Sequence, residues 1–184
     1  MKIACAVLAA GGSTRMGQPK QLLALHGQPL IVRVLEATAG LAHVAVVLGA
    51  NAQAISAAIP DVHILPNPRW SEGMATSLHT AVYWAQRLGV DALLVCTCDQ
   101  PLLSRAHLEQ LALTGTTAAS RYNGALGVPA LIEAHHFAQL LRIEGDRGAA
   151  SLLRSGIAVT AIDWPDGAVD LDTPEDVERI NSRA

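Results

Sequence analysis

The stretch VLAAGGSTRMGQPKQLL, residues 7–23, runs from an apolar segment into a loop rich in glycine and positive charge. Gly11 and Gly12 can adopt positive φ and let a ligand approach the backbone. Successive N–H groups in such a turn form an anion-binding concavity, and Arg15 and Lys20 add positive charge for a polyphosphate. An ordinary strand–helix connection needs no converging cations. The stretch therefore predicts a phosphate-binding loop at the end of a first strand.

Two common phosphate-binding motifs do not describe this loop. A Walker A loop requires lysine directly after its last glycine, whereas Gln18 follows Gly17 and Lys20 comes after a proline. The dinucleotide fingerprint G-x-G-x-x-G is absent from the stretch as well. The prediction of phosphate binding therefore rests on the glycines and cations themselves.

Short apolar runs alternate with amphipathic stretches along the chain. The runs predict strands at 3–10, 44–49, 62–65, 92–98, 128–132 and 157–164, and the stretches predict helices at 29–39, 51–58, 74–88, 104–113, 135–143, 147–155 and 174–182. This alternation predicts right-handed crossovers and a mostly parallel sheet. With 51% hydrophobic and 3% aromatic residues, the core is expected to be aliphatic, as in strands buried on both faces. We predict a three-layer, Rossmann-like α/β fold, formed as one domain by residues 1–184.

Three local features refine this prediction. Residues 114–129, TGTTAASRYNGALGVP, are rich in small and turn-forming residues, so we expect them to leave the regular sheet as a loop or a small hairpin near the ligand. Ser104 is the expected N-cap of the helix that follows it. Near the C-terminus, Thr173 and Pro174 predict another helix start.

The charge of the chain argues against nucleic-acid and membrane partners. A net charge of −3 provides no electrostatic footprint for either. The apolar run at 3–10 is shorter than the roughly 20 residues of a spanning helix, so we expect a buried strand and a cytoplasmic protein. Cys5, Cys96 and Cys98 lack paired metal-binding spacing and are expected to be small buried hydrophobes.

A carboxylate follows the apolar run 92–98 directly, in the motif CDQP. Ligands of open α/β sheets bind outside the carboxyl ends of the strands, where Asp99 is expected. Mg²⁺ takes one or two carboxylates together with phosphate oxygens and water. In VDLDTPED, Asp170 and Asp172 share a face if extended, whereas Asp176 fits a capping role. We predict Mg²⁺ at Asp99, with Asp172 or Asp170 as the second ligand.

The motif NPRWSEGMATSLHTAV places a turn before the predicted helix 74–88. Gly73 and Ser77 lie where helix N–H groups and a hydroxyl can contact a base or an anion. From the residues alone, simple capping of this helix by Ser71 is an open alternative. Trp70 either stacks on a ring or packs as an ordinary core residue.

The motif LAAGGSTRMGQPK resembles the signature of the MobA-like nucleotidyltransferases, most closely the molybdenum cofactor cytidylyltransferase branch. GMATSL, DQP, GVP, GDRGA and DLDTPED follow in order, so the resemblance covers nearly the whole chain. It implies that Arg15, Lys20 and Asp99 are catalytic. It further implies nucleotide contacts from Leu8, Ala9, Ala10, Gly11, Gly12, Arg15, Lys20, Gly73 and Ser77, and metal binding by Asp99 with Asp172 or Asp170.

The resemblance also bears on nucleotide and acceptor. In this family LAAG accompanies cytidylyl transfer and LAGG guanylyl transfer, so Ala10 implies CTP. The segments YNGALGVPAL and GDRGAASLL resemble acceptor-binding segments. They imply acceptor contacts from Gly127, Pro129, Gly145 and Asp146.

Two positions depart from the family pattern. Val128 stands where some relatives carry histidine, and Ala150 stands where they often carry arginine. Either Arg147 or Arg121 replaces that arginine, or the acceptor differs.

We therefore predict Mg²⁺-dependent transfer of CMP from CTP to molybdopterin cofactor, with release of pyrophosphate and with a molybdenum hydroxylase or its maturation factor as a further partner. One alternative is guanylyl or cytidylyl transfer to a sugar phosphate or methylerythritol phosphate. A second is a metal-dependent glycosyltransferase, whose Asp-x-Asp motif DLD imitates. A third is a non-catalytic carrier of molybdenum cofactor.

Overall fold

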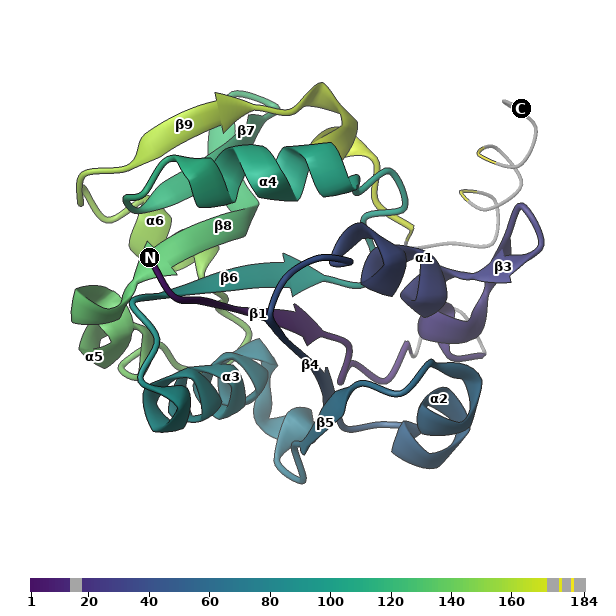
Figure 1. Cartoon of the computed structure of the whole chain (residues 1–184). Coiled ribbons are helices and arrows are strands. Elements are labelled where there is room, and N and C mark those ends of the chain that lie inside the picture. The colour runs from purple at the N-terminus through teal and green to yellow at the C-terminus, as the bar shows by residue number, and fades with distance from the viewer. Residues whose placement is uncertain (14–17, 172–175, 177–179, 181–184) are drawn as a thin grey trace.

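The computed structural model describes residues 1–13, 18–171, 176 and 180, and these residues form a seven-stranded sheet with helices on both faces (Figure 1). The strand order is β5–β4–β1–β6–β8–β7–β9. The strands span Ile3–Leu8 (β1), His43–Leu48 (β4), His63–Pro66 (β5), Ala92–Thr97 (β6), Ala118–Tyr122 (β7), Ala125–Glu133 (β8) and Thr160–Asp163 (β9). β5, β4, β1 and β6 are parallel, β8 is antiparallel to β6 and β7, and β9 is parallel to β7. The predicted mostly parallel sheet is confirmed.

The helices lie in two layers on either side of this sheet. They span Leu30–Ala37 (α1), Ala52–Ala58 (α2), Met74–Leu88 (α3), Arg105–Leu113 (α4), Phe137–Leu140 (α5) and Ala150–Leu153 (α6). Figure 1 shows the helices around the sheet. Side chains of α3, α5 and α6 belong to the core on one face, and those of α1, α2 and α4 to the core on the other. None of the helices among the described residues is long and apolar enough to cross a membrane.

Short elements complete the connections. They are β2 (Ala24–Leu25), β3 (Gln28–Pro29) and the 3₁₀ helices η1 (Lys20–Leu22), η2 (Trp70–Glu72), η3 (Ala134–His136) and η4 (Pro165–Ala168). β2 and β3 form a separate two-stranded antiparallel sheet. η1 lies near the end of the glycine-rich stretch 7–23 and carries Lys20 at its start.

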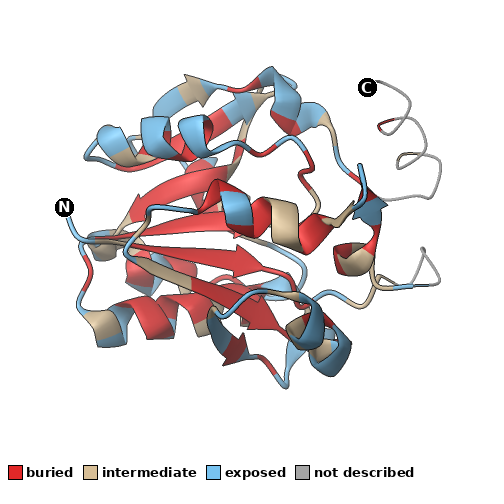
Figure 2. Ribbon diagram, turned by 45° about the vertical axis from the view of Figure 1, so that its right-hand side comes forward, coloured by how far each residue is buried: buried red, intermediate tan, exposed pale blue. Residues whose placement is uncertain are grey.

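The central strands contribute side chains to both layers of the core. Along β1, Ala4, Ala6 and Leu8 face the α3 side, while Cys5 and Val7 face the α1 side. Successive strand residues point to opposite faces of the sheet. A continuous apolar run therefore buries side chains on both faces, and Figure 2 shows these strands as buried. This burial removes the apolar surface from water and is the main stabilising contribution to the three-layer arrangement. The predicted three-layer arrangement is confirmed.

The expectation that residues 114–129 leave the regular sheet is wrong. They do form a hairpin, but its strands β7 and β8 extend the main sheet. Ser120 is fully buried there because its hydroxyl donates to a β8 carbonyl oxygen at 2.7 Å and lies 2.7 Å from Nε2 of His107. A polar side chain can be buried when its hydrogen-bonding groups have partners, and the periodicity of apolar residues does not predict such a position.

The predicted helices at 135–143 and 147–155 are shorter in the structure. α5 and α6 have four residues each, and Gly145 and Gly156 after them have φ of 65° and 92°, outside the helical region. Ser104 is confirmed as the N-cap of α4, since its hydroxyl accepts from the His107 N–H. Thr173 and Pro174 lie outside the described residues.

The three cysteines are free thiols in the core, as expected. Cys5 Sγ lies 3.9 Å from Cys96 Sγ, and all three side chains are buried on the α1 side. Burial and the nearby charge of Asp99 raise the pKa of the Cys98 thiol, so it stays protonated.

Candidate active site

A cavity of about 490 Å³ opens at the carboxyl ends of β1 and β6. Its walls come from the end of β1, the glycine-rich stretch, η1, the turn before α3 and the end of β6. The lining residues are Leu8, Ala9, Ala10, Gly11, Gly12, Lys20, Gln21, Trp70, Ser71, Gly73, Met74, Ser77, Thr97, Cys98, Asp99 and Asp146. This edge of an open α/β sheet is the expected place for a ligand.

The glycine-rich stretch is held in place by a buried glutamine. Gln21 Nε2 donates to the carbonyl oxygens of Ala9 at 2.9 Å and Gly11 at 3.0 Å. Ser13 Oγ donates to Gln21 Oε1 at 3.3 Å and accepts from the Lys20 N–H at 3.0 Å. Both ends of the loop are thus fixed to the start of η1. Arg15 lies outside the described residues.

The predicted residues Lys20 and Asp99, 79 positions apart, meet at the wall of the cavity. Lys20 Nζ lies 2.9 Å from Asp99 Oδ2. Burial opposes ionisation of Asp99, but the Lys20 charge and hydrogen bonds from Lys20 and Thr97 outweigh it. The pKa of Asp99 therefore lies below its ordinary value, and the carboxylate is ionised at neutral pH.

The segment that carries the second predicted carboxylate returns to the same place. Leu171 is fully buried, and its N–H donates to the Asp99 carbonyl oxygen at 3.1 Å. Burial and then the charge of Asp170, with a smaller contribution from Asp99, raise the pKa of the Tyr122 hydroxyl. The charges of Asp170 and Asp99 therefore both affect the Tyr122 hydroxyl. Asp172 lies outside the described residues.

The oxygen donors here fit a Mg²⁺-type ion. Asp99 is an ionised carboxylate on the cavity wall, and Asp170 lies one residue from the Leu171 contact. Within the described part of the chain, no three His, Cys, Asp or Glu side chains group to hold an ion. One or two carboxylates completed by phosphate oxygens is the usual arrangement around protein-bound Mg²⁺.

Trp70 forms one wall of the cavity and packs on two glycines. A Cβ at Gly49 would come within 2.5 Å of the Trp70 side chain, and one at Gly12 within 3.1 Å. Trp70 can therefore come this close to the backbone only because both positions lack side chains. Trp70 remains 37% exposed, which leaves part of its ring accessible to a ligand.

Gly73 and Ser77 also line the cavity, on the turn before α3 and its first turns. Gly73 is the N-cap residue of α3, with φ of 117° and without a side-chain cap, so capping by Ser71 is wrong. Asn67 Nδ2 donates to Thr76 Oγ1 at 2.9 Å and to Ser77 Oγ at 3.0 Å. The turn is therefore fixed by Asn67.

The four predicted acceptor residues separate into two pairs. Asp146 lines the cavity, and the Gly145 carbonyl oxygen accepts from the Ala75 N–H at 3.0 Å. Gly127 and Pro129 lie in β8 and are not among the cavity-lining residues.

The second pair, Gly127 and Pro129, makes contacts that hold the β7–β8 hairpin together. Gly127 lacks a Cβ where the Tyr122 hydroxyl packs, and the Pro129 carbonyl oxygen accepts from Ser120. The structure therefore does not bring all four acceptor candidates together.

Two buried amides that contact the walls of the cavity, Gln21 and Asn67, were not found from the sequence. Gln21 is 1% and Asn67 3% exposed, although both are polar. The available signal was a polar residue inside or beside an apolar run, in KQLL and ILPNP. That signal does not reveal which carbonyl or hydroxyl groups the two amides contact.

Residues 5–161 match the MobA-like NTP transferase domain. The chain belongs to this family. The resemblance to the MobA-like nucleotidyltransferases is confirmed, and the protein is a nucleotidyltransferase with the predicted fold.

Several curated relatives of this MobA-like chain carry different names. A molybdenum cofactor guanylyltransferase of Rhodobacter capsulatus is 30% identical and aligns over 100% of this chain and 97% of its own length. Purine catabolism protein PucB of Bacillus subtilis is 31% identical, over 94% and 93%. A nicotine blue oxidoreductase of Paenarthrobacter nicotinovorans is 32% identical, over 95% and 94%.

Two solved structures from mycobacteria share the MobA-like fold of this chain. An Rv0371c homologue from Mycobacterium sp. strain JC1 has a TM-score of 0.86 and 26% identity, covering 99% of this chain and 96% of the other. Rv0371c of Mycobacterium tuberculosis in complex with manganese has a TM-score of 0.80 and 27% identity, covering 100% of both chains.

Proposed function

We propose that this protein transfers CMP from CTP to molybdopterin cofactor in a Mg²⁺-dependent reaction that releases pyrophosphate. The observation that carries the proposal is the Lys20–Asp99 pair, 2.9 Å apart, beside the glycine-rich stretch. A cation and an ionised carboxylate at one wall suit a triphosphate with its metal. Family membership supports nucleotidyl transfer itself.

Asp99 would hold the metal ion together with Asp170 or Asp172. When bound, a divalent ion neutralises charge on the phosphates of the nucleotide. A manganese complex of a mycobacterial neighbour supports divalent-metal binding in this fold.

The side chains of this protein position the reactants and balance their charge. An acceptor phosphate oxygen forms a new bond to the α-phosphorus, and the bond from that phosphorus to the pyrophosphate oxygen breaks. The positive charges of Lys20 and Arg15 stabilise the negative charge of the departing pyrophosphate. Gln21 keeps the loop N–H groups in place for the phosphates, so that little reorganisation is needed at the transition state.

Ala10 supports CTP as the nucleotide. This residue is 4% exposed and lines the cavity, so its methyl group occupies space beside the ligand. A methyl group at this wall narrows the site against the larger purine ring. The name of the Rhodobacter relative, a guanylyltransferase, makes GTP the second candidate.

Molybdopterin cofactor is supported as acceptor by the same relative's name and by the place of Asp146 at the cavity. The names of the PucB and nicotine blue relatives belong to those proteins and do not specify a different acceptor for the cavity described above.

The proposal is tested by pyrophosphate release from CTP and GTP, each with molybdopterin cofactor and Mg²⁺. We expect faster release from CTP, a loss of roughly 10²-fold or more in Asp99→Asn, and no loss in the control Asp163→Asn, which alters an exposed pair with Arg121. In Ala10→Gly the CTP-to-GTP ratio should shift toward GTP by roughly tenfold. Nucleotide binding without turnover would support a carrier instead, and release only with a sugar phosphate would change the acceptor.

A further inference from the structure

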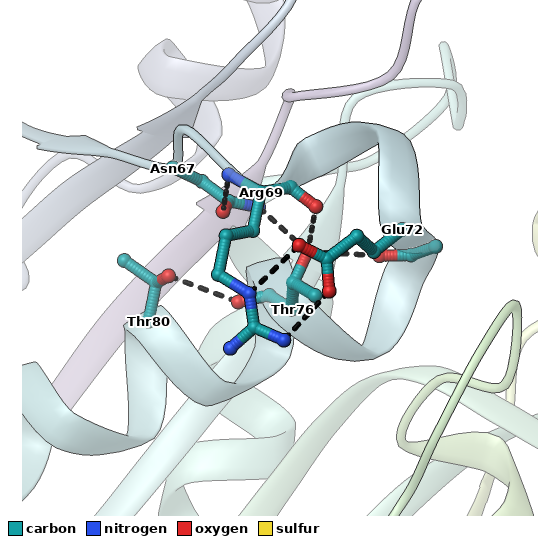
Figure 3. Close-up of polar contacts among 6 residues, drawn as sticks. Asn67, Arg69, Glu72, Thr76 and Thr80 are labelled. Carbon is teal, nitrogen blue, oxygen red and sulfur yellow. Dashed lines mark hydrogen bonds and ion pairs between the residues drawn. The ribbon is translucent and has the colours of Figure 1, made fainter.

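A buried amide, Asn67, lies directly behind the cavity wall formed by α3. Asn67 is 3% exposed and is held by its own backbone, because its N–H donates to the Leu48 carbonyl oxygen at 2.7 Å. Its side chain contacts two successive hydroxyl groups, those of Thr76 and Ser77, at 2.9 and 3.0 Å. Figure 3 shows the Asn67 and Thr76 part of this network.

The orientation of this amide is fixed by its partners. Asn67 Oδ1 accepts from the Arg69 backbone N–H at 3.0 Å, so the NH₂ group at the opposite end of the amide faces Thr76 (Figure 3). The same NH₂ group contacts Ser77. The reversed orientation would place two donors against each other at Arg69. Asn67 therefore donates to both hydroxyl groups.

The two hydroxyl groups then differ in where their hydrogens can point. The one hydroxyl hydrogen of Thr76 is shared between two carbonyl oxygens, those of Arg69 at 3.0 Å and Gly73 at 2.9 Å from Oγ1. Ser77 Oγ accepts from Asn67, and its hydroxyl hydrogen has no acceptor among the hydrogen bonds of the described residues. Ser77 lines the cavity and is 6% exposed.

We propose that Asn67 is a positioning residue that sets Ser77 as a hydrogen-bond donor toward the base of the bound nucleotide. This inference rests on the proposed function and adds to it the chemistry of base selection. A buried donor prefers a base that offers a ring nitrogen or carbonyl oxygen at that position, and it rejects a ligand without one. Asn67 itself does not touch the ligand and acts through Ser77.

The substitution Asn67→Asp tests the direction of this hydrogen bond at constant shape. One carboxylate oxygen keeps the bond from the Arg69 N–H, and the other faces Ser77 as an acceptor. The Ser77 hydrogen then turns to the carboxylate and away from the cavity. We expect CTP to bind roughly tenfold more weakly in the presence of Mg²⁺, as for the loss of one hydrogen bond.

Two comparisons separate positioning from general damage. Inorganic triphosphate has no base, so its calorimetric affinity should be the same in wild type and Asn67→Asp, which also shows that the cavity is intact. Ser77→Ala should weaken CTP to a similar degree, and Asn67→Asp should add little in that background. Glu72→Gln alters the neighbouring Arg69–Glu72 pair, 2.6 Å apart, and should leave CTP affinity unchanged.

The outcomes also separate this inference from the proposed function. Wild type that binds neither CTP nor GTP would remove the proposed function. Wild type that binds CTP, with unchanged affinity in Asn67→Asp and Ser77→Ala, would overturn the role of Asn67 alone. Equal losses of CTP and inorganic triphosphate in Asn67→Asp would also overturn it, because the effect would then be independent of the base.

Discussion

Gly73 lies so close to Gly145 that a methyl group on Gly73 would overlap the Gly145 carbonyl group. The same carbonyl oxygen accepts from the Ala75 N–H at 3.0 Å, so the loop before α6 caps the N-terminus of α3. This contact joins Gly73, which lines the cavity, to the loop that carries Asp146. Backbone contacts therefore connect the proposed nucleotide-binding turn at Gly73 to the proposed acceptor-binding loop at Gly145 and Asp146.

Gly73→Ala should destabilise the protein by about 3 kcal/mol or more, because it combines positive φ with a backbone overlap. The matched control is Gly89→Ala, where φ is 59° and a Cβ would meet no neighbour within 4 Å. This control should cost only about 1 kcal/mol. Urea unfolding of both variants measures the difference, and equal losses would contradict an essential Gly73–Gly145 contact.

Lys20→Met should raise the pKa of Asp99. The folded pKa of Asp99 is depressed, so its ionised form stabilises the fold above the ordinary pKa of about 3.9, and this contribution disappears as pH falls through the depressed value. Carboxyl NMR titration of the metal-free protein measures the shift. Arg121→Met removes an exposed cation near Asp163 instead and should leave Asp99 unchanged. An unchanged Asp99 titration in Lys20→Met would show that the pair does not govern its pKa.

Gln21→Leu should destabilise the protein by about 1–3 kcal/mol, since it leaves the Ala9 and Gly11 carbonyl oxygens without their donor. It should also raise the KM for the nucleotide, because the loop loses its fixed path. Thermal unfolding and steady-state kinetics at several nucleotide concentrations measure the two effects. Gln21→Glu provides the paired comparison, because a protonated carboxyl group can restore one donor at low pH. The account of Gln21 fails if KM stays at its wild-type value in Gln21→Leu.

Stability should decrease on acidification because of His107. Burial lowers the pKa of this imidazole to about 4, and the charge of Asp166 opposes the shift only in part. The unfolded chain, with an ordinary histidine pKa of about 6.5, binds the proton first, so about 2 kcal/mol of stability is lost between pH 7 and pH 5. In His107→Gln this component should disappear from the pH dependence of urea unfolding. A variant with the wild-type pH slope would assign the loss to other groups.

Much of the architecture could be predicted because its causes are local. The helix at 74–88 was predicted with the bounds of α3, since Leu78, Val82 and Ala85 form one fully buried stripe. β7 was missed because Ser120 interrupts its pattern, and the hydroxyl partners that permit its burial come from β8 and α4.

The sequence predicted those residues of the candidate site that directly follow a strand, because the carboxyl ends of parallel strands mark the ligand-binding edge of the sheet. Asp99 after β6 is such a residue, and its contact with Lys20 follows from the adjacency of β1 and β6. Gln21 and Asn67 were missed because each forms hydrogen bonds with backbone carbonyl or side-chain hydroxyl groups whose positions depend on the path of a loop. The separation of Gly127 and Pro129 from the cavity likewise depends on how the β7–β8 hairpin joins the main sheet, whereas the sequence predicted that this segment leaves the sheet.

The packing of Trp70 on Gly12 and Gly49 gives this chain a built-in optical probe. Of the three tryptophans, Trp84 and Trp164 are each 6% exposed and are absent from the cavity lining, whereas Trp70 forms part of it. A change in emission on adding a nucleotide can therefore be assigned to one indole at a known wall. Ligand binding and release can be timed on the unlabelled protein, with Trp70→Phe as the silent reference.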